Sequence, residues 1–255
     1  MNAEDLVSAL DLPSHSRVDQ RVPKKYLIDH GAVTAQDKKA ITDGVEDLIW
    51  IAALKPSTVG VSAFEDSTRQ YLEIAVLTLS LRRNAKAQRL RELVHRAIPY
   101  PLVLMTIDDD GVTLSLSHLR QAENDSSKMV LEGRIVSSSV PPDAVGTAFL
   151  ASLALAGLPK ENLFVLYQGW LDRMTALDVA RHTGTFALAS SREANEVRRQ
   201  SLWEIARIDG EIAAIRSNAE KATQVNRRVE FNLELRRLQA ERTRHAARLG
   251  NEDGE

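Results

Sequence analysis

The chain has no cysteine among its 255 residues. That absence excludes a disulfide framework, a thiolate zinc site and a cysteine nucleophile, and it agrees with a reducing compartment. The most apolar stretch, 144–158, is shorter than the roughly 20 residues that span a bilayer, and Pro142 and Pro159 bound it. The N-terminus has no basic region before a long apolar run, so we expect no secretory signal. These features predict a cytoplasmic protein without membrane contact.

Neither sign of charge dominates, because the chain has 33 lysine and arginine residues and 35 acidic residues, which gives a net charge of -2. Binding to nucleic acid would therefore require a local basic patch. Phosphate loops, dinucleotide fingerprints, the HExxH metal motif and the GxSxG elbow are also missing. No catalytic residue, cofactor or metal site is predicted from motifs.

The apolar patterning predicts an α/β (α+β) protein. An extended arm with a short helix (12–31) leads to a helix that begins after the N-cap Thr34 and runs to Trp50. A strand over 71–81 precedes a helix (84–97), three strands (102–107, 112–119 and 128–136) in a meander, and a helix that is capped by Asp143 and ends at Gly157. The order αβββα is followed by a second helix with a core-facing stripe over 163–177.

Residues 193–249 contain no proline and one glycine, Gly210. Apolar residues recur there every three or four positions from Ile205 to Leu233, which is typical of a heptad seam. From Phe231 onward the stripe changes phase. The shift favours a helical hairpin over one long helix, because a hairpin buries both stripes within one chain. A coiled coil through which two copies pair is the other possibility.

The segment TQVNRRVEFN (223–232) places polar residues on that seam. One interpretation is structural: Asn226 fixes the register or the point of reversal, and Arg227 and Arg228 pair with Glu230 or Glu234. The other is functional, because residues 227–248 hold seven arginines against three glutamates, a net +4 that attracts phosphate or an acidic protein.

These patterns predict three regions. Residues 1–140 form an α/β core domain with an N-terminal extended arm, and residues 141–190 form two helices that pack on the core. Residues 191–255 form a charged helical hairpin or coiled coil with an acidic tail.

Six segments resemble, in order, the motifs of a bacterial family, the domain of unknown function numbered 4391. Two positions depart from its pattern, since Leu119 stands where the family often has lysine and Arg134 where it often has glutamate. The segments are LDLPSHSRVDQRVPKK (10–25), DLIWIAALKPSTVGV (47–61), RAIPYPLVLMTI (96–107), VTLSLSHLRQ (112–121), MVLEGRIV (129–136) and QVNRRVEFNLELRRL (224–238).

The family is often encoded beside DNA methyltransferases and helicases in restriction-like or anti-phage loci. The resemblance therefore implies a non-catalytic accessory subunit of a DNA-modification or antiviral defence system. Its expected partner is a DNA methyltransferase or helicase of the same system. DNA and a second copy of the chain, bound through the C-terminal helices, are further partners that the sequence leaves open.

The alternative is a Mg²⁺-dependent endonuclease, intact or degenerate, because αβββα is the core order of restriction-type nucleases. Such enzymes hold Mg²⁺ between an Asp near the second strand and a Glu on the third, with a nearby lysine. Here Asp108, Asp110, Glu132 and Arg134 occupy those places. However, arginine cannot exchange a proton as lysine does, and Asp-Asp-Gly is also typical of a hairpin turn.

Basic residues near the first core helix are either a solvated helix face or a DNA-phosphate contact. His118 on its strand is predicted mainly as a packing or hydrogen-bonding residue. The candidate nucleic-acid or partner-binding residues are Lys24, Lys25, Arg82, Arg83, Lys86, Arg89, His118, Arg120, Arg227 and Arg228.

Overall fold

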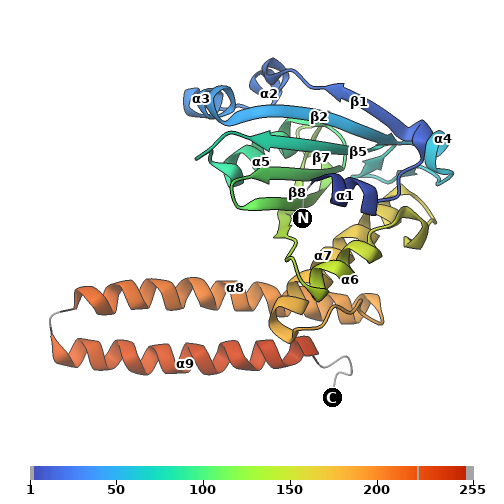
Figure 1. Cartoon of the computed structure of the whole chain (residues 1–255). Helices are drawn as coiled ribbons and strands as arrows, with labels where there is room; N and C mark the ends of the chain where they lie inside the picture. The colour runs from blue at the N-terminus through green and yellow to red at the C-terminus, as the bar shows by residue number, and fades with distance from the viewer. Residues whose placement is uncertain (1–2, 223, 251–255) are drawn as a thin grey trace. The chain divides into compact units, whose positions relative to one another are not determined.

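The computed structural model describes residues 3–222 and 224–250 and forms two compact units, Met1–Met174 and Thr175–Glu255 (Figure 1). The boundary falls inside helix α7 (Leu163–Thr183). The first unit is built on a six-stranded sheet, and the C-terminal helices make up most of the second. This confirms the predicted α/β class with flanking helices and a helical C-terminal part. Among the described residues, no helix has both the length and the apolar character needed to cross a bilayer.

The sheet of the first unit has the order β1-β2-β5-β6-β7-β8. Only the β5–β6 pair is parallel, and helix α5 (Ala87–Ala97) makes the crossover between these two strands. The strands are β1 (Arg17–Arg21), β2 (Val45–Leu54), β5 (Ile74–Leu81), β6 (Leu102–Asp108), β7 (Gly111–Ala122) and β8 (Asp125–Ser139). A separate two-stranded sheet pairs β3 (Phe64–Glu65) with β4 (Gln70–Tyr71), and a short helix, α4 (Pro56–Val59), follows β2.

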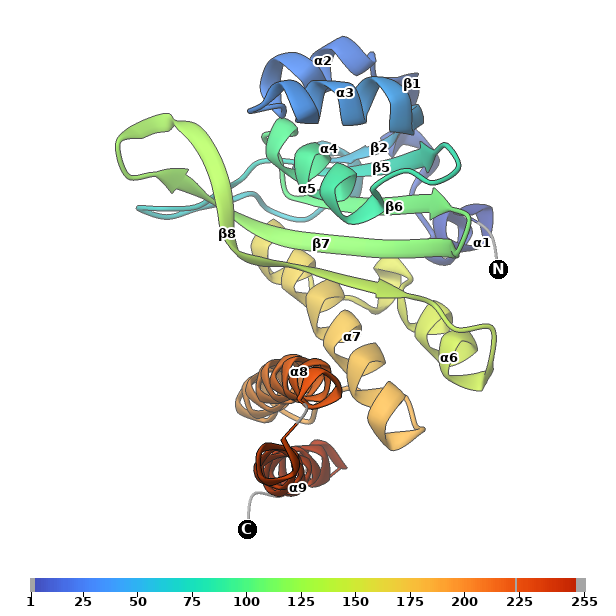
Figure 2. The same cartoon turned by 90° about the vertical axis from the view of Figure 1, so that its left-hand side faces the viewer.

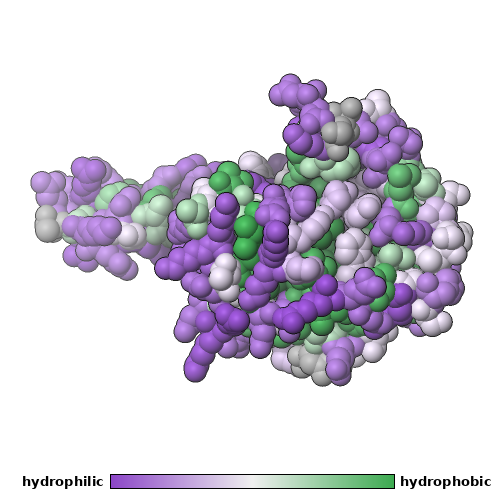
Figure 3. Space-filling model, turned by 90° about the horizontal axis from the view of Figure 1, so that it is seen from above, coloured by the Kyte–Doolittle hydropathy of each residue, from purple (hydrophilic) through white to green (hydrophobic). Residues whose placement is uncertain are grey.

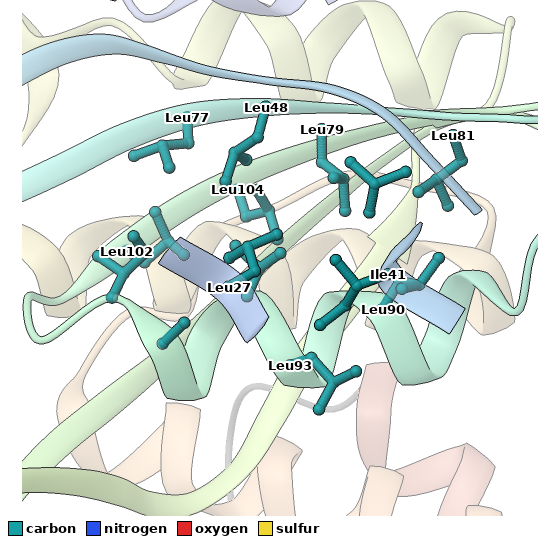
Figure 4. Packing of buried hydrophobic residues seen from close by; sticks show 14 of the residues in the cluster. Leu27, Ile41, Leu48, Leu77, Leu79, Leu81, Leu90, Leu93, Leu102 and Leu104 are labelled. Atoms are coloured by element: carbon teal, nitrogen blue, oxygen red, sulfur yellow. The ribbon is translucent and has the colours of Figure 1, made fainter. Parts of the chain in front are cut away.

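One face of the sheet is covered by α2 (Lys24–His30), α3 (Ala35–Gly44) and α5 (Figure 2). Their leucines and isoleucines interleave with those of β2, β5 and β6 in one buried cluster (Figure 4). Leu27, Leu77, Leu93 and Leu104 in this cluster are fully buried. Burial of such side chains stabilises the fold by roughly 1.5–3 kcal/mol each relative to an exposed position.

On the opposite face lie α1 (Ala3–Ala9), α6 (Ala144–Ser152) and the first turns of α7 (Figure 2). The indole Nε1 of Trp170 donates to the carbonyl of Leu153 at 3.0 Å. Arg173 donates to the carbonyls of Ser152 (2.6 Å) and Gly157 (2.8 Å). These bonds satisfy carbonyls at the end of α6 and in the 3-10 turn Leu155–Gly157 that follows it. Helix α7 therefore holds both segments in place.

The predicted helix from Thr34 to Trp50 is only half correct. Thr34 does begin α3 through a capping box with Asp37, but the helix ends at Gly44 and residues 45–54 form strand β2. Val45 and Leu48 lie in the same core cluster although they are three residues apart, because a register shift between Val45 and Asp47 interrupts the alternation of faces in β2. The resulting spacing of apolar residues imitates a helical stripe, and periodicity alone does not separate the two. Gly44 also fits at the junction because an added Cβ would lie 2.9 Å from Leu90 Cδ1.

The predicted order helix, three strands, helix is confirmed as α5, β6, β7, β8 and α6. Strands β6, β7 and β8 form an antiparallel meander, and Asp109 and Asp110 make the turn between the first two. The helix predicted to run from Asp143 to Gly157 is shorter, because α6 ends at Ser152. Strand β5 begins at Ile74, three residues after the predicted start.

The second unit contains the hairpin that the phase shift favoured. Helices α8 (Arg192–Lys221) and α9 (Val225–Gly250) run antiparallel (Figure 1). Ile208 and Ile212 of α8 pack against Leu238, while Ile205 packs against Leu249. An ion pair between Asp209 and Arg242 Nε at 2.6 Å joins the two helices.

The predicted seam is wrong over the first turns of α9. Asn226 is exposed, as are Val229 (53%) and Leu233 (62%), because the shifted stripe that includes Leu235 and Leu238 faces α8. Asn226 therefore lies beside the reversal but not in the interface. Glu234 pairs with Arg237 at 2.6 Å, not with the preceding arginines.

The buried hydroxyl of Tyr167 joins α7 to two strands. It accepts from the N–H of Ser117 (2.9 Å) and lies 2.8 Å from the carbonyl of Leu102 and 3.0 Å from that of Ser117. We expect Tyr167→Phe to lower the free energy of unfolding by about 1–3 kcal/mol, because it leaves buried backbone groups without a partner. Urea denaturation measures this change.

Tyr100→Phe is the matched control, since the hydroxyl of this half-buried tyrosine makes no hydrogen bond to the described residues. Its stability should stay within about 0.5 kcal/mol of the parent protein. Equal stability of the two variants would show that the Tyr167 hydroxyl does not support the fold.

Candidate functional site

Two of the predicted basic residues meet at the C-terminal end of α3. Lys24 Nζ donates to the carbonyl of Thr42 (3.3 Å) and Arg82 Nη1 to the carbonyl of Asp43 (3.4 Å). Free carbonyls at a helix C-terminus attract cations, which explains why both side chains turn toward this end. Burial and the positive charges of Arg82 and Arg21 lower the pKa of Lys24. The cations at this position are thus crowded enough to repel one another.

A pocket of about 350 Å³ opens beside that helix end. It is lined by Lys39 and Asp43 of α3 and by Arg83 and Lys86 of the segment that leads into α5. Three cations there face one carboxylate. We define the basic surface as Lys24, Lys39, Arg82, Arg83 and Lys86; Lys39 was not among the predicted residues.

Arg89 was predicted as part of the same patch, but its charge is neutralised. Its Nε and Nη2 donate to the two oxygens of Asp37 at 2.9 Å each, and Nη1 donates to Glu92 at 2.8 Å. The Arg89 guanidinium, together with the N-cap bonds from Thr34, holds the pKa of Asp37 well below its usual range. Arg89 therefore joins α5 to α3, while Lys25 is exposed on α2.

The carboxylates of the nuclease hypothesis do not converge. Asp108 lies opposite Gly111 at one end of β7, whereas Glu132 lies opposite His118. Gly111 and His118 are seven positions apart, which separates the two carboxylates by roughly 20 Å, since a strand rises about 3.3 Å per residue. Two ligands of one Mg²⁺ ion must approach it within about 2.1 Å. The residues of this set therefore do not fit the ion.

The aspartate cluster instead forms the β6–β7 turn. Asp108 Oδ1 accepts from the N–H of Asp110 at 3.0 Å, and Asp109 Oδ2 accepts from the N–H of Asn84 at 3.3 Å. Side-chain to backbone bonds of this kind are typical of aspartate in turns. Within the described ranges, no group of three or more histidine, aspartate or glutamate residues is arranged to hold a metal ion.

His118 lies in a chain of hydrogen bonds on the α7 face of the sheet. Burial raises the pKa of Tyr71, so its hydroxyl keeps its proton and donates to His118 Nδ1. His118 Nε2 then donates to Gln168 Oε1 at 2.8 Å, and Gln168 Nε2 donates to Asp172 at 2.6 Å. Both ring nitrogens are used by the protein itself, which agrees with the predicted hydrogen-bonding role.

Glu132 forms an ion pair beside that chain. Arg69 Nε and Nη2 donate to its two oxygens at 2.7 and 2.5 Å, and the Arg69 guanidinium lies 5.4 Å from the Phe164 ring centroid. The bond from Arg69 lowers the pKa of Glu132. Arg69 lies in the connection between β3 and β4, and Tyr71 lies in β4, so the two motif residues His118 and Glu132 fasten this hairpin to the main sheet.

The remaining predicted residues are not among those that form the basic surface. Arg120, near the end of β7, pairs with Glu123 (3.3 Å) and donates to the carbonyl of Gln121 (3.1 Å). Arg227 stacks over Phe231 at 6.0 Å, and Arg228 is exposed on α9 in the second unit. Arg134 is exposed on β8.

The sequence reasoning missed Arg69, Tyr71 and Gln168. Arg69 is 63 positions from Glu132, and Gln168 is 50 positions from His118. No local spacing reveals such pairs. Lys39 was detectable in principle, because it lies on the polar side of a helix that ends beside the predicted patch.

The Arg69–Glu132 pair predicts a pH-dependent stability. A carboxyl whose pKa is lowered in the folded state stabilises the protein above the unfolded pKa, about 4.3, and loses this effect as the pH falls through the folded value. We expect Glu132→Gln to cost about 1 kcal/mol at neutral pH, since the pair is partly exposed. Urea titrations across the acid range should show the difference from the parent protein shrinking below about pH 4.

The exposed Glu161→Gln is the control and should leave the acid profile of stability unchanged. A Glu132→Gln penalty that is constant from neutral to acid pH would contradict the assignment of this effect to the ion pair.

The sequence was also compared with known proteins. No curated protein and no solved structure matches the chain. One family profile does match, over residues 10–241, and its description is a domain of unknown function, DUF4391. That span includes all of the sheet and most of the hairpin. The chain is a member of the DUF4391 family.

Proposed function

We propose that this protein is a non-catalytic accessory subunit of a bacterial DNA-modification or anti-phage defence system. In this proposal the basic surface holds the DNA backbone, and the hairpin binds a DNA methyltransferase or helicase of the same system. The observation that carries the proposal is the crowding of cations at the end of α3. Burial lowers the pKa of Lys24 most, and the nearby Arg82 lowers it further; an incoming phosphate would offset this repulsion between the two cations.

The charge balance of the molecule supports a local contact. The net charge is only -2, so long-range attraction to DNA is weak and binding depends on the few cations of the basic surface. Arg69 and Arg89 are each held by two hydrogen bonds to one carboxylate, whereas the pocket beside α3 is lined by three cations and a single carboxylate, Asp43. The basic surface therefore retains charge that a phosphate backbone can use.

Exposed apolar residues of the hairpin support a protein contact. Val229 and Leu233 are one turn apart on α9, so they share a face, and more than half of each side chain is exposed. Trp203 of α8 is 42% exposed. The space-filling view shows hydrophobic residues among the hydrophilic ones that cover the hairpin (Figure 3). A contiguous apolar patch with a polar rim marks a partner-binding site, and Val229 and Leu233 are neighbours on one face of α9.

The endonuclease alternative has no comparable support. Asp108 lies opposite the first residue of β7, whereas Glu132 lies opposite His118, seven positions further along the strand, and is engaged by Arg69. No step of a hydrolytic reaction follows from this arrangement.

The DNA contact is tested with the double variant Arg83→Glu, Lys86→Glu. We expect the parent protein to bind duplex DNA with an affinity that falls steeply with salt. The variant should bind at least about tenfold more weakly, with a salt slope reduced by about two, since each lost phosphate contact lowers it by about one. Fluorescence anisotropy over a salt series measures both quantities.

Lys160→Glu makes half the charge change at an exposed residue of a distant loop and is the control. An unchanged affinity of the double variant, or binding that does not respond to salt, would refute the DNA contact.

The protein contact is tested with Val229→Ser, Leu233→Ser. These residues face away from α8, so the hairpin should fold normally by circular dichroism. We expect the variant to lose most co-purification with the methyltransferase or helicase of the system. Val33→Ser, at a 73% exposed position, is the control. Equal recovery of the partner with both proteins would rule out this face of α9.

A further inference from the structure

A second pocket, of about 560 Å³, lies on the other side of α5, between this helix and β8. Arg91 and Arg96 line it from α5, and Arg134 lines it from β8. Leu131 and Ile135 give it an apolar wall. We call it the arginine pocket. Its volume is within the range of roughly 300–1,000 Å³ that is usual for small-ligand sites.

A β-bulge turns Arg134 toward this pocket. Glu132 pairs with His118 and Val136 with Leu116, so residues 133–135 lie opposite the single residue Ser117. Gly133 has φ +77°, a value that favours glycine. In a regular strand, Arg134 would point to the same face as Glu132, because residues two apart share a face. Instead three consecutive residues, 133–135, line the arginine pocket, while Glu132 binds Arg69 on the opposite face.

The arginine pocket has an excess of positive charge, because three arginines line it together with one carboxylate, Glu92. Arg96 Nη2 contacts Glu92 at 2.7 Å, but Arg89 also binds this carboxylate, at 2.8 Å. Arg91 Nη1 is 3.9 Å from Asp108, too far for a hydrogen bond. That nitrogen is buried and has no hydrogen-bond partner among the described residues. Burial lowers the pKa of Arg91, and Arg134 forms no ion pair within the described part of the chain.

We propose that the arginine pocket binds a phosphoryl group, carried either by a free nucleotide or by the end of a nucleic-acid strand. Guanidinium groups bind phosphate through paired hydrogen bonds, and several arginines around one cavity match the charge and the oxygens of a phosphate dianion. The apolar wall beside them suits a sugar or base attached to it. This site lies on the other side of α5 from the basic surface and does not depend on the proposed contact with duplex DNA.

Binding is measured by calorimetry with inorganic phosphate and with ATP, and by anisotropy with short single strands that carry either a 5′-phosphate or a 5′-hydroxyl. The principal variant is Arg134→Gln, because the exposed Arg134 can be changed without disturbing the core. Arg91→Gln is the second variant, with its folding checked by thermal unfolding. Lys160→Gln is the matched control for loss of one positive charge at an exposed position.

We expect the phosphate-bearing probes to bind and Arg134→Gln to weaken binding at least about tenfold, with no effect of Lys160→Gln. Preference for the 5′-phosphate strand over ATP assigns the site to a strand end, and the reverse assigns it to a nucleotide. Absence of binding at millimolar concentrations, or equal affinity of Arg134→Gln and the parent protein, overturns the inference. Loss of binding in Arg83→Glu, Lys86→Glu but not in Arg134→Gln also overturns it, and leaves the proposed DNA contact standing.

Discussion

The central strands β5 and β6 must be covered on both faces, and the rest of the first unit follows from that constraint. Seven of the eight residues of β5 are buried, as are the first five of β6. Parallel strands of this kind require a crossover helix, which α5 provides on one face, while α7 closes the other. The position of α5 then fixes both candidate surfaces. Its start lies beside the end of α3, and its other side faces β8.

Local signals were sufficient to predict much of this architecture. Thr34 and Asp143 each mark a helix start by side-chain chemistry, and the Asp-Asp-Gly sequence after β6 marks a turn. Local sequence patterns gave the wrong prediction where contacts between distant parts of the chain determine the structure. Val45 and Leu48 have helical spacing because a register shift interrupts the alternation of β2, and α9 offered two apolar stripes of which one pairs with α8. The phase shift revealed the hairpin but not which stripe faces inward.

The sequence predicted most of the basic residues of the candidate site, but it did not predict which of them form ion pairs with distant residues. Arg82, Arg83 and Lys86 are adjacent in sequence, so a cationic segment was visible, and Lys24 joins it across the α2–α3 region. Arg89 belongs to the same sequence cluster but is neutralised by Asp37, 52 positions away. Likewise, the motif residues His118 and Glu132 have a structural explanation that depends on Tyr71 and Arg69. A recurring polar motif is therefore not by itself a sign of catalysis.

At the bulge beside Gly133, the direction of side chains in β8 changes locally without a change in the faces that the rest of the strand presents. Residues 133–135 of β8 lie opposite the single residue Ser117 of β7, so β8 has two extra residues here. Side chains in a strand return to the same face every two residues. The ladder on either side therefore keeps its alternation of faces, with Glu132 and Val136 both on the α7 side. Insertions or deletions of residue pairs here would remodel the wall of the arginine pocket while the pairing of the hairpin tip and of the strand base stays unchanged. Strand β8 is thus a place where ligand preference can diverge between relatives at little cost to the sheet.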